Sequence, residues 1–210
     1  MRYCETLCCA GTISSLEEAQ VLCATCLFGK LTVVLDLDET LVHAVHHIAL
    51  CRGCVPFCYF ENLKIYKRPY VDLFLDTVFE RYDVYIWTAA HKSYARKVLA
   101  HLLKPKHIPI RVLTRNDTLH IKNRERLMYS CRADNVVKIK PLSKLNCRLS
   151  RTVMIDDTLS CFSRNLANGI QIKEFDDPEK QTDDCVLLNL LVELDRLSDS
   201  NDVRSDEFLL

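Results

Sequence analysis

The chain has 210 residues, of which 49% are hydrophobic and 27% charged, so it holds enough apolar material for one domain with its own core. Its 28 basic and 28 acidic residues give a formal net charge of zero, which argues against a nucleic-acid binder, because such proteins usually carry a basic excess. No apolar run approaches the roughly 18 residues of a membrane-spanning helix, and the first residues do not form a secretory signal. We therefore expect a monomeric intracellular protein, nuclear or cytoplasmic, without a transmembrane segment.

Twelve cysteines are many for a chain of this length, and two pairs have the spacing Cys-x-x-Cys, Cys23/Cys26 and Cys51/Cys54. Such pairs can bind zinc. The first predicted strand lies between the pairs and would hold them roughly 15 Å apart, at about 3.3 Å per residue. We therefore favour free thiols in a reducing compartment over a shared zinc site. Residues 1–29, which contain five of the cysteines, are interpreted as an amino-terminal extension.

After this extension, apolar runs typical of strands alternate with amphipathic runs typical of helices. The periodicity predicts strands at residues 31–35, 84–87, 110–113 and 152–155, and helices at residues 71–82, 93–103 and 185–197. This alternation indicates an α/β fold, a Rossmann-like parallel sheet flanked by helices, formed by residues 30–198. Residues 44–66 are too many for a tight connection and are expected to form a small flap or hairpin over the site. Residues 199–210 are polar and are expected to be a flexible tail.

Acidic side chains follow two of the predicted strands. Asp36 and Asp38 leave the first strand, and Asp156 and Asp157 leave the fourth. The two-residue spacing of the first pair directs both side chains to one region if the backbone stays extended. In an open α/β sheet, ligands bind at the carboxyl ends of the strands. Carboxylates gathered there need a cation, and Mg²⁺ prefers oxygen ligands; Lys140 could add positive charge beside a bound phosphate monoester.

Other interpretations of these residues are weaker. An EF-hand loop that begins at Asp36 would need glycine at its sixth position and glutamate at its twelfth, where this chain has Leu41 and His47. Each acid could instead cap a helix or a turn, and Lys140 alone could be a solvated surface residue. The recurrence of acidic pairs after two apolar strands favours a common site.

The string DLDETLVH, residues 36–43, resembles the first motif of the haloacid dehalogenase superfamily, and more narrowly that of its small carboxy-terminal-domain phosphatases. Four later segments resemble further family segments in the same order: Lys67–Val71, Trp87-Thr88-Ala89, Lys140-Pro-Leu-Ser143 and Ile155-Asp156-Asp157-Thr158. The resemblance extends over residues 31–197. The insert at residues 44–66 is short and cysteine-rich, unlike the usual hairpin insert, so it leaves the preferred substrate sequence open.

The resemblance implies a catalytic function for four residues. Asp36 would be the nucleophile and a metal ligand. Asp38 would protonate the leaving oxygen and later activate water, and its main-chain carbonyl would bind Mg²⁺. Thr88 would bind the phosphoryl group, and Lys140 would hold its charge.

The resemblance also implies binding residues. Asp156 would bind Mg²⁺, and Asp157 would support the metal ligands. Arg115 and Ala89 would lie near the substrate. Thr40, counted with the substrate-binding residues, would order the loop.

These features predict a Mg²⁺-dependent phosphatase that acts on phosphoserine or phosphothreonine in proteins through a phospho-aspartate on Asp36. The carboxy-terminal domain of RNA polymerase II, or a similar phosphopeptide, is a candidate substrate. A carboxylate nucleophile divides hydrolysis into two transfers, and a second carboxyl must be protonated in one and ionised in the other. A dehalogenase would need neither Asp38 nor the metal cluster. Two alternatives stay open: a small-molecule phosphatase of the same fold, and a non-catalytic scaffold or translocase-type module.

Overall fold

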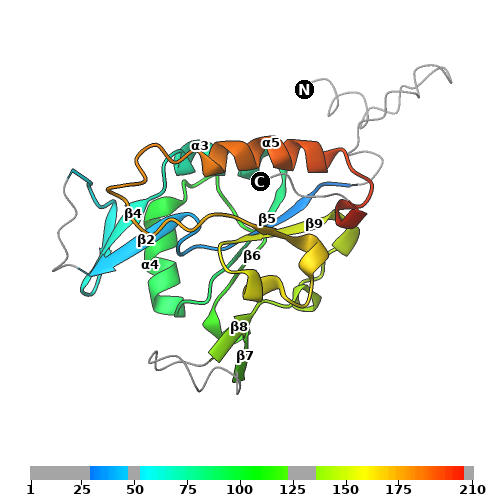
Figure 1. The fold of residues 1–210 in the computed structure, drawn as a ribbon, viewed down its shortest axis with the longest axis horizontal. Coiled ribbons are helices and arrows are strands. Elements are labelled where there is room, and N and C mark those ends of the chain that lie inside the picture. Colours follow the sequence, from blue (N-terminus) through cyan, green and yellow to red (C-terminus); the bar gives the residue numbers. More distant parts are fainter. Residues whose placement is uncertain (1–28, 47–52, 123–135, 206–210) are drawn as a thin grey trace.

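The computed structural model describes residues 29–46, 53–122 and 136–205, and Figure 1 draws the other residues as a thin grey trace. The predicted amino-terminal extension therefore lies outside the described residues, apart from Gly29, and so do Cys23, Cys26 and Cys51. Free thiols are present, as expected, at Cys58, Cys147, Cys161 and Cys185. None of the helices in the described ranges has the length and the apolar character that crossing a bilayer demands.

A five-stranded parallel sheet forms the centre of the molecule (Figure 1). Its strands are, in spatial order, β10 (Gly169–Gln171), β9 (Thr152–Asp156), β1 (Thr32–Leu35), β5 (Asp83–Trp87) and β6 (Arg111–Leu113). The register sets Leu35 of β1 opposite Ile86 of β5 and Ile155 of β9. The three central strands therefore end at the same level, and the predicted parallel α/β sheet is confirmed.

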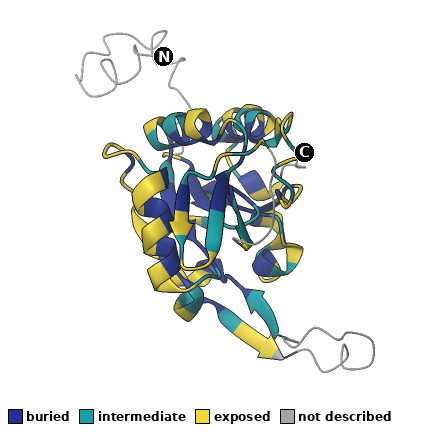
Figure 2. Cartoon of the chain, turned by 90° about the vertical axis from the view of Figure 1, so that its left-hand side faces the viewer, coloured by how far each residue is buried: buried dark blue, intermediate teal, exposed yellow. Residues whose placement is uncertain are grey.

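Successive residues of β1 point to opposite faces of the sheet, and each face has its own core. Val33 and Leu35 belong to a large cluster, which includes residues from the helices α3 (Val71–Arg81), α4 (Lys92–Leu102) and α5 (Val186–Ser198). Val34 belongs to a second cluster, with side chains from the short 3₁₀ helices η4 (Leu142–Lys144) and η6 (Leu159–Phe162). The sheet is thus buried on both faces, as its continuous apolar strands require (Figure 2).

Two smaller sheets border the central one. A three-stranded antiparallel sheet, in the order β2 (Val42–His46), β4 (Leu63–Lys67) and β3 (Cys58–Phe60), contains the described part of the expected flap. A two-stranded ribbon, β7 (Leu119–Lys122) and β8 (Val136–Ile139), was not predicted and projects from the body in Figure 2. The ribbon brings β8 back to the sheet just before Lys140.

The expected flexible tail is wrong for residues 199–205. These residues include the 3₁₀ helix η8 (Val203–Ser205), and the side chain of Val203 is fully buried. Buried Arg151 donates hydrogen bonds to the carbonyl oxygens of Ser198 (2.9 Å) and Ser200. Because a buried guanidinium needs acceptors, this pairing holds the segment that follows α5 against the domain.

Candidate active site

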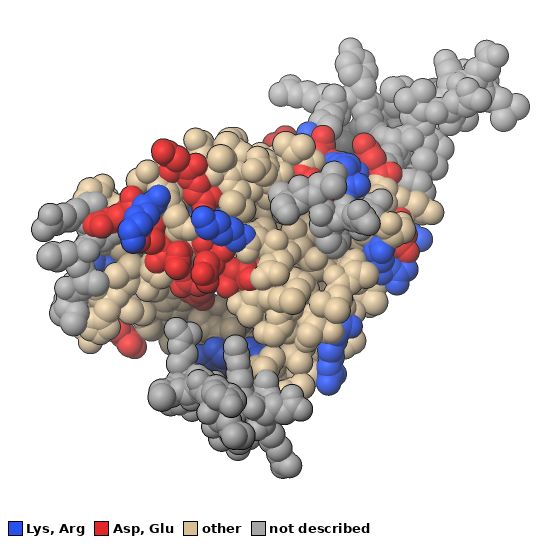
Figure 3. Space-filling model, in the orientation of Figure 1, with Lys and Arg blue, Asp and Glu red and all other residues tan. Residues whose placement is uncertain are grey.

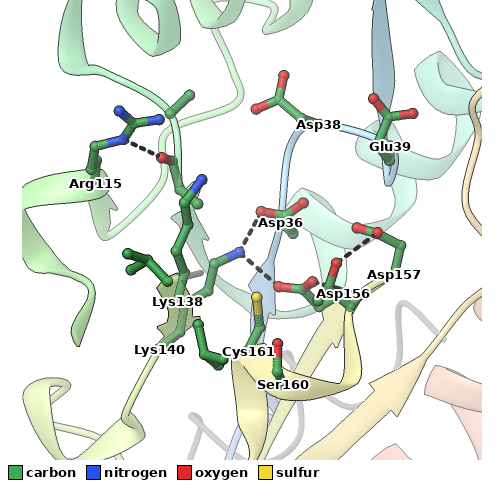
Figure 4. A pocket seen from close by; sticks show the side chains of 15 residues that line it. Asp36, Asp38, Glu39, Arg115, Lys138, Lys140, Asp156, Asp157, Ser160 and Cys161 are labelled. Carbon is green, nitrogen blue, oxygen red and sulfur yellow. Dashed lines mark hydrogen bonds and ion pairs between the residues drawn. The ribbon is translucent and has the colours of Figure 1, made fainter. Parts of the chain in front are cut away.

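A hollow of about 500 Å³ opens at the carboxyl edge of the central sheet (Figure 4). Asp36 follows β1, and Asp156 ends the neighbouring strand β9. The amide of Asp36 donates a hydrogen bond to the carbonyl oxygen of Ile155 (3.0 Å), so the two strand ends are joined directly. Adjacent parallel strands therefore bring together two acids that are far apart in the sequence.

Lys140 lies between these two carboxylates (Figure 4) and is only 1% exposed. Its ammonium donates hydrogen bonds to Oδ1 of Asp36 and to Oδ2 of Asp156, the latter at 2.7 Å. Burial by itself lowers the pKa of Lys140, but Asp36 and Asp156 outweigh this effect and hold the pKa above its ordinary value. Burial raises the pKa of Asp36, and Lys140 opposes that shift. The ammonium is thus a fixed positive charge at the bottom of the hollow.

Three of the acids fit a divalent cation. Asp36, Asp156 and Asp157 each place one carboxylate oxygen within 4.8 Å of the others. When all three are ionised, they and the single ammonium of Lys140 carry a net formal charge of minus two, which a divalent cation would neutralise. A set of carboxylate oxygens suits a hard cation such as Mg²⁺.

The side chain of Asp38 does not join this group, and Figure 4 shows it directed away from Asp36. A turn follows Asp38, and its first residue, Glu39, has a φ of 60°, in the left-handed region. The two-residue spacing therefore does not by itself bring both side chains into one set of candidate metal ligands. Any contact of Asp38 with the metal would have to use its main-chain carbonyl, which is the contact that the family resemblance implies.

Two hydroxyl groups hold the carboxylate of Asp38. Thr88, just after β5, donates from Oγ1 to Oδ2 of Asp38 at 3.0 Å, and Tyr94 of α4 donates from its hydroxyl to Oδ1 at 2.5 Å. Burial raises the pKa of Asp38, whereas these two hydrogen bonds oppose the increase. Thr88 Oγ1 also accepts a hydrogen bond from the amide of Ala90 (2.9 Å). Thr88 is fully buried, so it acts on the site through Asp38.

The other expected substrate-binding residues have different positions. Ala89 and Arg115 line the hollow, and Arg115 Nε donates to the carbonyl oxygen of Ala89 (3.0 Å). Thr40 does not line the hollow: its side chain is fully buried, and its carbonyl oxygen accepts a hydrogen bond from Arg68 (3.1 Å). Thr40 is therefore placed to order the loop but not to touch a substrate.

Sequence reasoning missed three residues that surround the site. Lys138 of β8 and Cys161 of η6 line the hollow, and Tyr94 binds Asp38. Lys138 precedes Lys140 by two residues in an extended segment, so strand periodicity could have placed both on one side. Tyr94 has no comparable signal, because an aromatic residue on the apolar face of a helix usually belongs to the core.

The chain is similar to known phosphatases over most of its length. The model of the NLI interacting factor-like phosphatase family matches residues 31–204. The CTD nuclear envelope phosphatase 1 homolog of Drosophila melanogaster is 34% identical over 193 residues, which cover 85% of this chain and 72% of that protein. CTD nuclear envelope phosphatase 1B of Danio rerio is 32% identical, and the match covers 82% of this chain and 69% of that protein.

Two solved structures share the fold. The RNA polymerase II CTD phosphatase Fcp1 superposes with a TM-score of 0.50 at 20% identity, and fission yeast Fcp1 bound to beryllium fluoride with 0.51 at 19% identity. These matches cover 85% and 92% of this chain but only 59% and 63% of the solved chains. The chain therefore spans about three-fifths of the proteins whose fold it shares.

Proposed function

Because the chain belongs to the NLI interacting factor-like phosphatase family, and is therefore a phosphatase, we propose that it removes phosphate from phosphoserine or phosphothreonine in proteins. The reaction would proceed through a phospho-aspartate on Asp36. The observation that carries this proposal is the buried ion-pair cluster in which Lys140 joins Asp36 to Asp156 at the carboxyl edge of the sheet.

In the first step, a carboxylate oxygen of Asp36 attacks phosphorus, and the bond from phosphorus to the ester oxygen breaks. Lys140 holds Oδ1 of Asp36, which fixes the carboxylate and offsets the repulsion between two anions. Mg²⁺ bound by Asp36, Asp156, Asp157 and the main-chain carbonyl of Asp38 would polarise the phosphoryl group.

Asp38 would transfer the protons. In its neutral form it would give a proton to the leaving serine or threonine oxygen, and the rise in its pKa with burial supports that form. The resulting carboxylate would take a proton from a water molecule that attacks the phospho-aspartate. Phosphate would then leave, and Asp36 and Asp38 would return to their starting states.

The surroundings of the hollow support a polypeptide substrate. The described part of the insert is a small antiparallel sheet, whereas a small-molecule phosphatase of this fold would be expected to carry a larger cap. Lys138 and Arg115 line the hollow and would attract a phosphoryl group. The names of the relatives refer to the nuclear envelope and to the polymerase carboxy-terminal domain, so we infer a phosphopeptide substrate of that kind and a nuclear location.

Turnover of p-nitrophenyl phosphate tests this proposal. We expect turnover to require Mg²⁺ and to fall by about a thousandfold or more in Asp36→Asn, because the nucleophile is lost. Asp72→Asn, at an exposed acid on α3 that pairs with Lys67, is the matched control and should retain wild-type activity. Protein that is quenched with acid during turnover should carry an acyl phosphate. Turnover without metal, or full activity of Asp36→Asn, would refute the mechanism.

A panel of substrates separates the two enzymatic interpretations. A protein phosphatase should hydrolyse phosphoserine and phosphothreonine peptides with a higher kcat/KM than sugar phosphates or nucleotides, because the open hollow can contact the flanking residues. A preference for a small metabolite would favour the alternative of a small-molecule phosphatase.

A further inference from the structure

A second hollow, of about 580 Å³, lies between α4 and the edge strand β6. We call it the α4–β6 groove; it is lined by residues of α4, of β6 and of the 3₁₀ helix η2 (Arg115–Asp117). Its apolar lining comes from Ala95, Leu99, Ala100 and Val112. The groove is separate from the catalytic hollow, and none of its lining residues has a function in the proposed reaction.

The strand beside this groove is an unpaired edge with an apolar stripe. In the described part of the chain, β6 is the last strand of the sheet and pairs only with β5. Ile108, Ile110 and Val112 occupy alternate positions at and before β6, and they are 78%, 55% and 40% exposed. The chain bends at Ile110, just before β6 begins at Arg111, and the three exposed side chains form a short apolar stripe along this part of the chain. An edge of this kind can accept an extended polypeptide as an additional strand.

The charged residues of the groove are mostly basic. Lys92, Arg96 and Arg111 line it and are exposed, and Asp117 is the acidic member, 3.9 Å from Arg111. No ion pair joins Lys92 or Arg96 to an acid among the residues that the structure describes. The chain has no net charge, but Figure 3 shows acidic side chains gathered elsewhere, over the loop that leads into α5. The groove therefore complements an acidic segment.

The groove lies directly beside the catalytic hollow. Arg115 and Ala90 line the catalytic hollow, whereas Thr114, Asn116 and Lys92, their near neighbours in sequence, line the groove. His91, the one residue between Ala90 and Lys92, is joined to Arg115 by a hydrogen bond of 2.9 Å, so the two hollows share a border. An extended polypeptide advances about 3.3 Å per residue, so a segment four to eight residues from the phosphorylated side chain would be roughly 13 to 26 Å away and could reach along the groove.

On the basis of the proposed function, we propose that the α4–β6 groove binds the part of the substrate polypeptide that flanks the phosphorylated residue. The segment would lie extended along β6, with apolar side chains against Leu99 and Val112. Acidic side chains of the segment would lie within reach of the long side chains of Lys92, Arg96 and Arg111. The protein would therefore select phosphoserine or phosphothreonine sites with a segment of acidic and apolar residues at this distance.

Phosphoserine peptides with designed flanks test this inference. One peptide carries alternating Glu and Val four to eight residues before the phosphoserine, and a second carries the same segment after it. Matched peptides have Gln or Lys in place of Glu. We expect the Glu segment on one side to raise kcat/KM about five- to tenfold over Gln, through a lower KM, because several weak surface ion pairs add uniform binding. The preference should decrease as the salt concentration rises.

A charge-reversal variant makes the test specific. Lys92→Glu combined with Arg96→Glu should reverse the preference, so that the Lys peptide becomes the better substrate. Lys30→Glu, at an exposed lysine before the amino end of β1, is the matched control and should keep the wild-type preference. Each kcat/KM is divided by the value for p-nitrophenyl phosphate in the same variant, so that any loss of folded protein cancels.

The outcomes distinguish this inference from the proposed function. Absence of turnover on every phosphate ester would refute the proposed function. Turnover with equal kcat/KM for the Glu, Gln and Lys peptides would leave that function in place and overturn the inference about the groove. A dimer in solution that dissociates in the charge-reversal variant would also overturn it, because a second copy of the chain would then cover the groove.

Discussion

Asp38 is held by two hydroxyl groups from different elements, Thr88 after β5 and Tyr94 on α4. Each hydroxyl binds a different oxygen of the carboxylate, so the side chain is restricted to one orientation. Thr88 belongs to a motif recognised in the sequence, whereas Tyr94 does not. Within the proposed mechanism, Tyr94 is therefore a positioning residue for the proton donor.

A comparison of two substrates with different leaving groups tests whether Tyr94 positions a proton donor. Serine alkoxide needs a proton in order to leave, whereas p-nitrophenolate leaves without one. We expect Tyr94→Phe to lower kcat/KM for a phosphoserine peptide by about tenfold to a hundredfold, and to change kcat/KM for p-nitrophenyl phosphate much less. Tyr82→Phe, at a buried tyrosine at the end of α3, is the control. Equal losses on both substrates would show that Tyr94 supports the fold only.

Among the elements, the contact between β10 and η6 depends on the absence of a side chain. Gly169 begins β10 with an ordinary φ of −97°, so it is not required for its conformational freedom. A Cβ at this position would lie 2.1 Å from a ring carbon of Phe162 in η6. The neighbouring residue Cys161 accepts a hydrogen bond from the amide of Lys140 (2.7 Å). This close packing therefore sets the position of the 3₁₀ turn that supports Lys140.

Substitution of Gly169 should therefore destabilise the protein through overpacking. We expect Gly169→Ala to lower the free energy of unfolding by about 1–3 kcal/mol, measured by urea denaturation. Phe162→Ala removes the three ring atoms that lie nearest to that Cβ, so the double variant should lose less stability than the sum of the two single changes. Strict additivity of the two effects would indicate that the clash is not the cause.

At the scale of the whole molecule, metal binding depends on where the charged residues lie and not on the net charge. Strand ends that are distant in sequence bring Asp36, Asp156 and Asp157 within 4.8 Å of one another, and burial raises the pKa of Asp36. A cation that binds these acids only in the folded state must stabilise the fold by linkage. The metal site and the stability of the domain are therefore coupled.

Thermal unfolding with and without Mg²⁺ measures this coupling. At a Mg²⁺ concentration 100 times the dissociation constant, linkage would add about 2.7 kcal/mol to the free energy of unfolding and raise the Tm. Asp156→Asn should abolish the increase because it removes a ligand, whereas Asp195→Asn, at an exposed acid that pairs with Arg81 on α3, should retain it. An equal increase in Tm for Asp156→Asn would show that Mg²⁺ acts elsewhere.

The sequence by itself determined the strands β1, β5, β6 and β9, the helices α3, α4 and α5, and the edge at which the acids meet. Local hydrophobic periodicity was sufficient for the buried strands β1, β5 and β9, and parallel connections place all their carboxyl ends together. These two rules place Asp36 and Asp156 at the same edge, whereas the structure shows that their strands are neighbours. The family resemblance added the chemical assignment of each acid.

Tertiary structure decided the remaining features. Thr88 and Tyr94 fix the side chain of Asp38, the latter from a helix, and Arg151 secures residues 199–205. The β7–β8 ribbon and the α4–β6 groove likewise exist only where separate elements meet. Each of these features depends on contacts between residues that are distant in the chain. Local periodicity reports which face of an element is buried, but it carries no information about which distant partner covers that face.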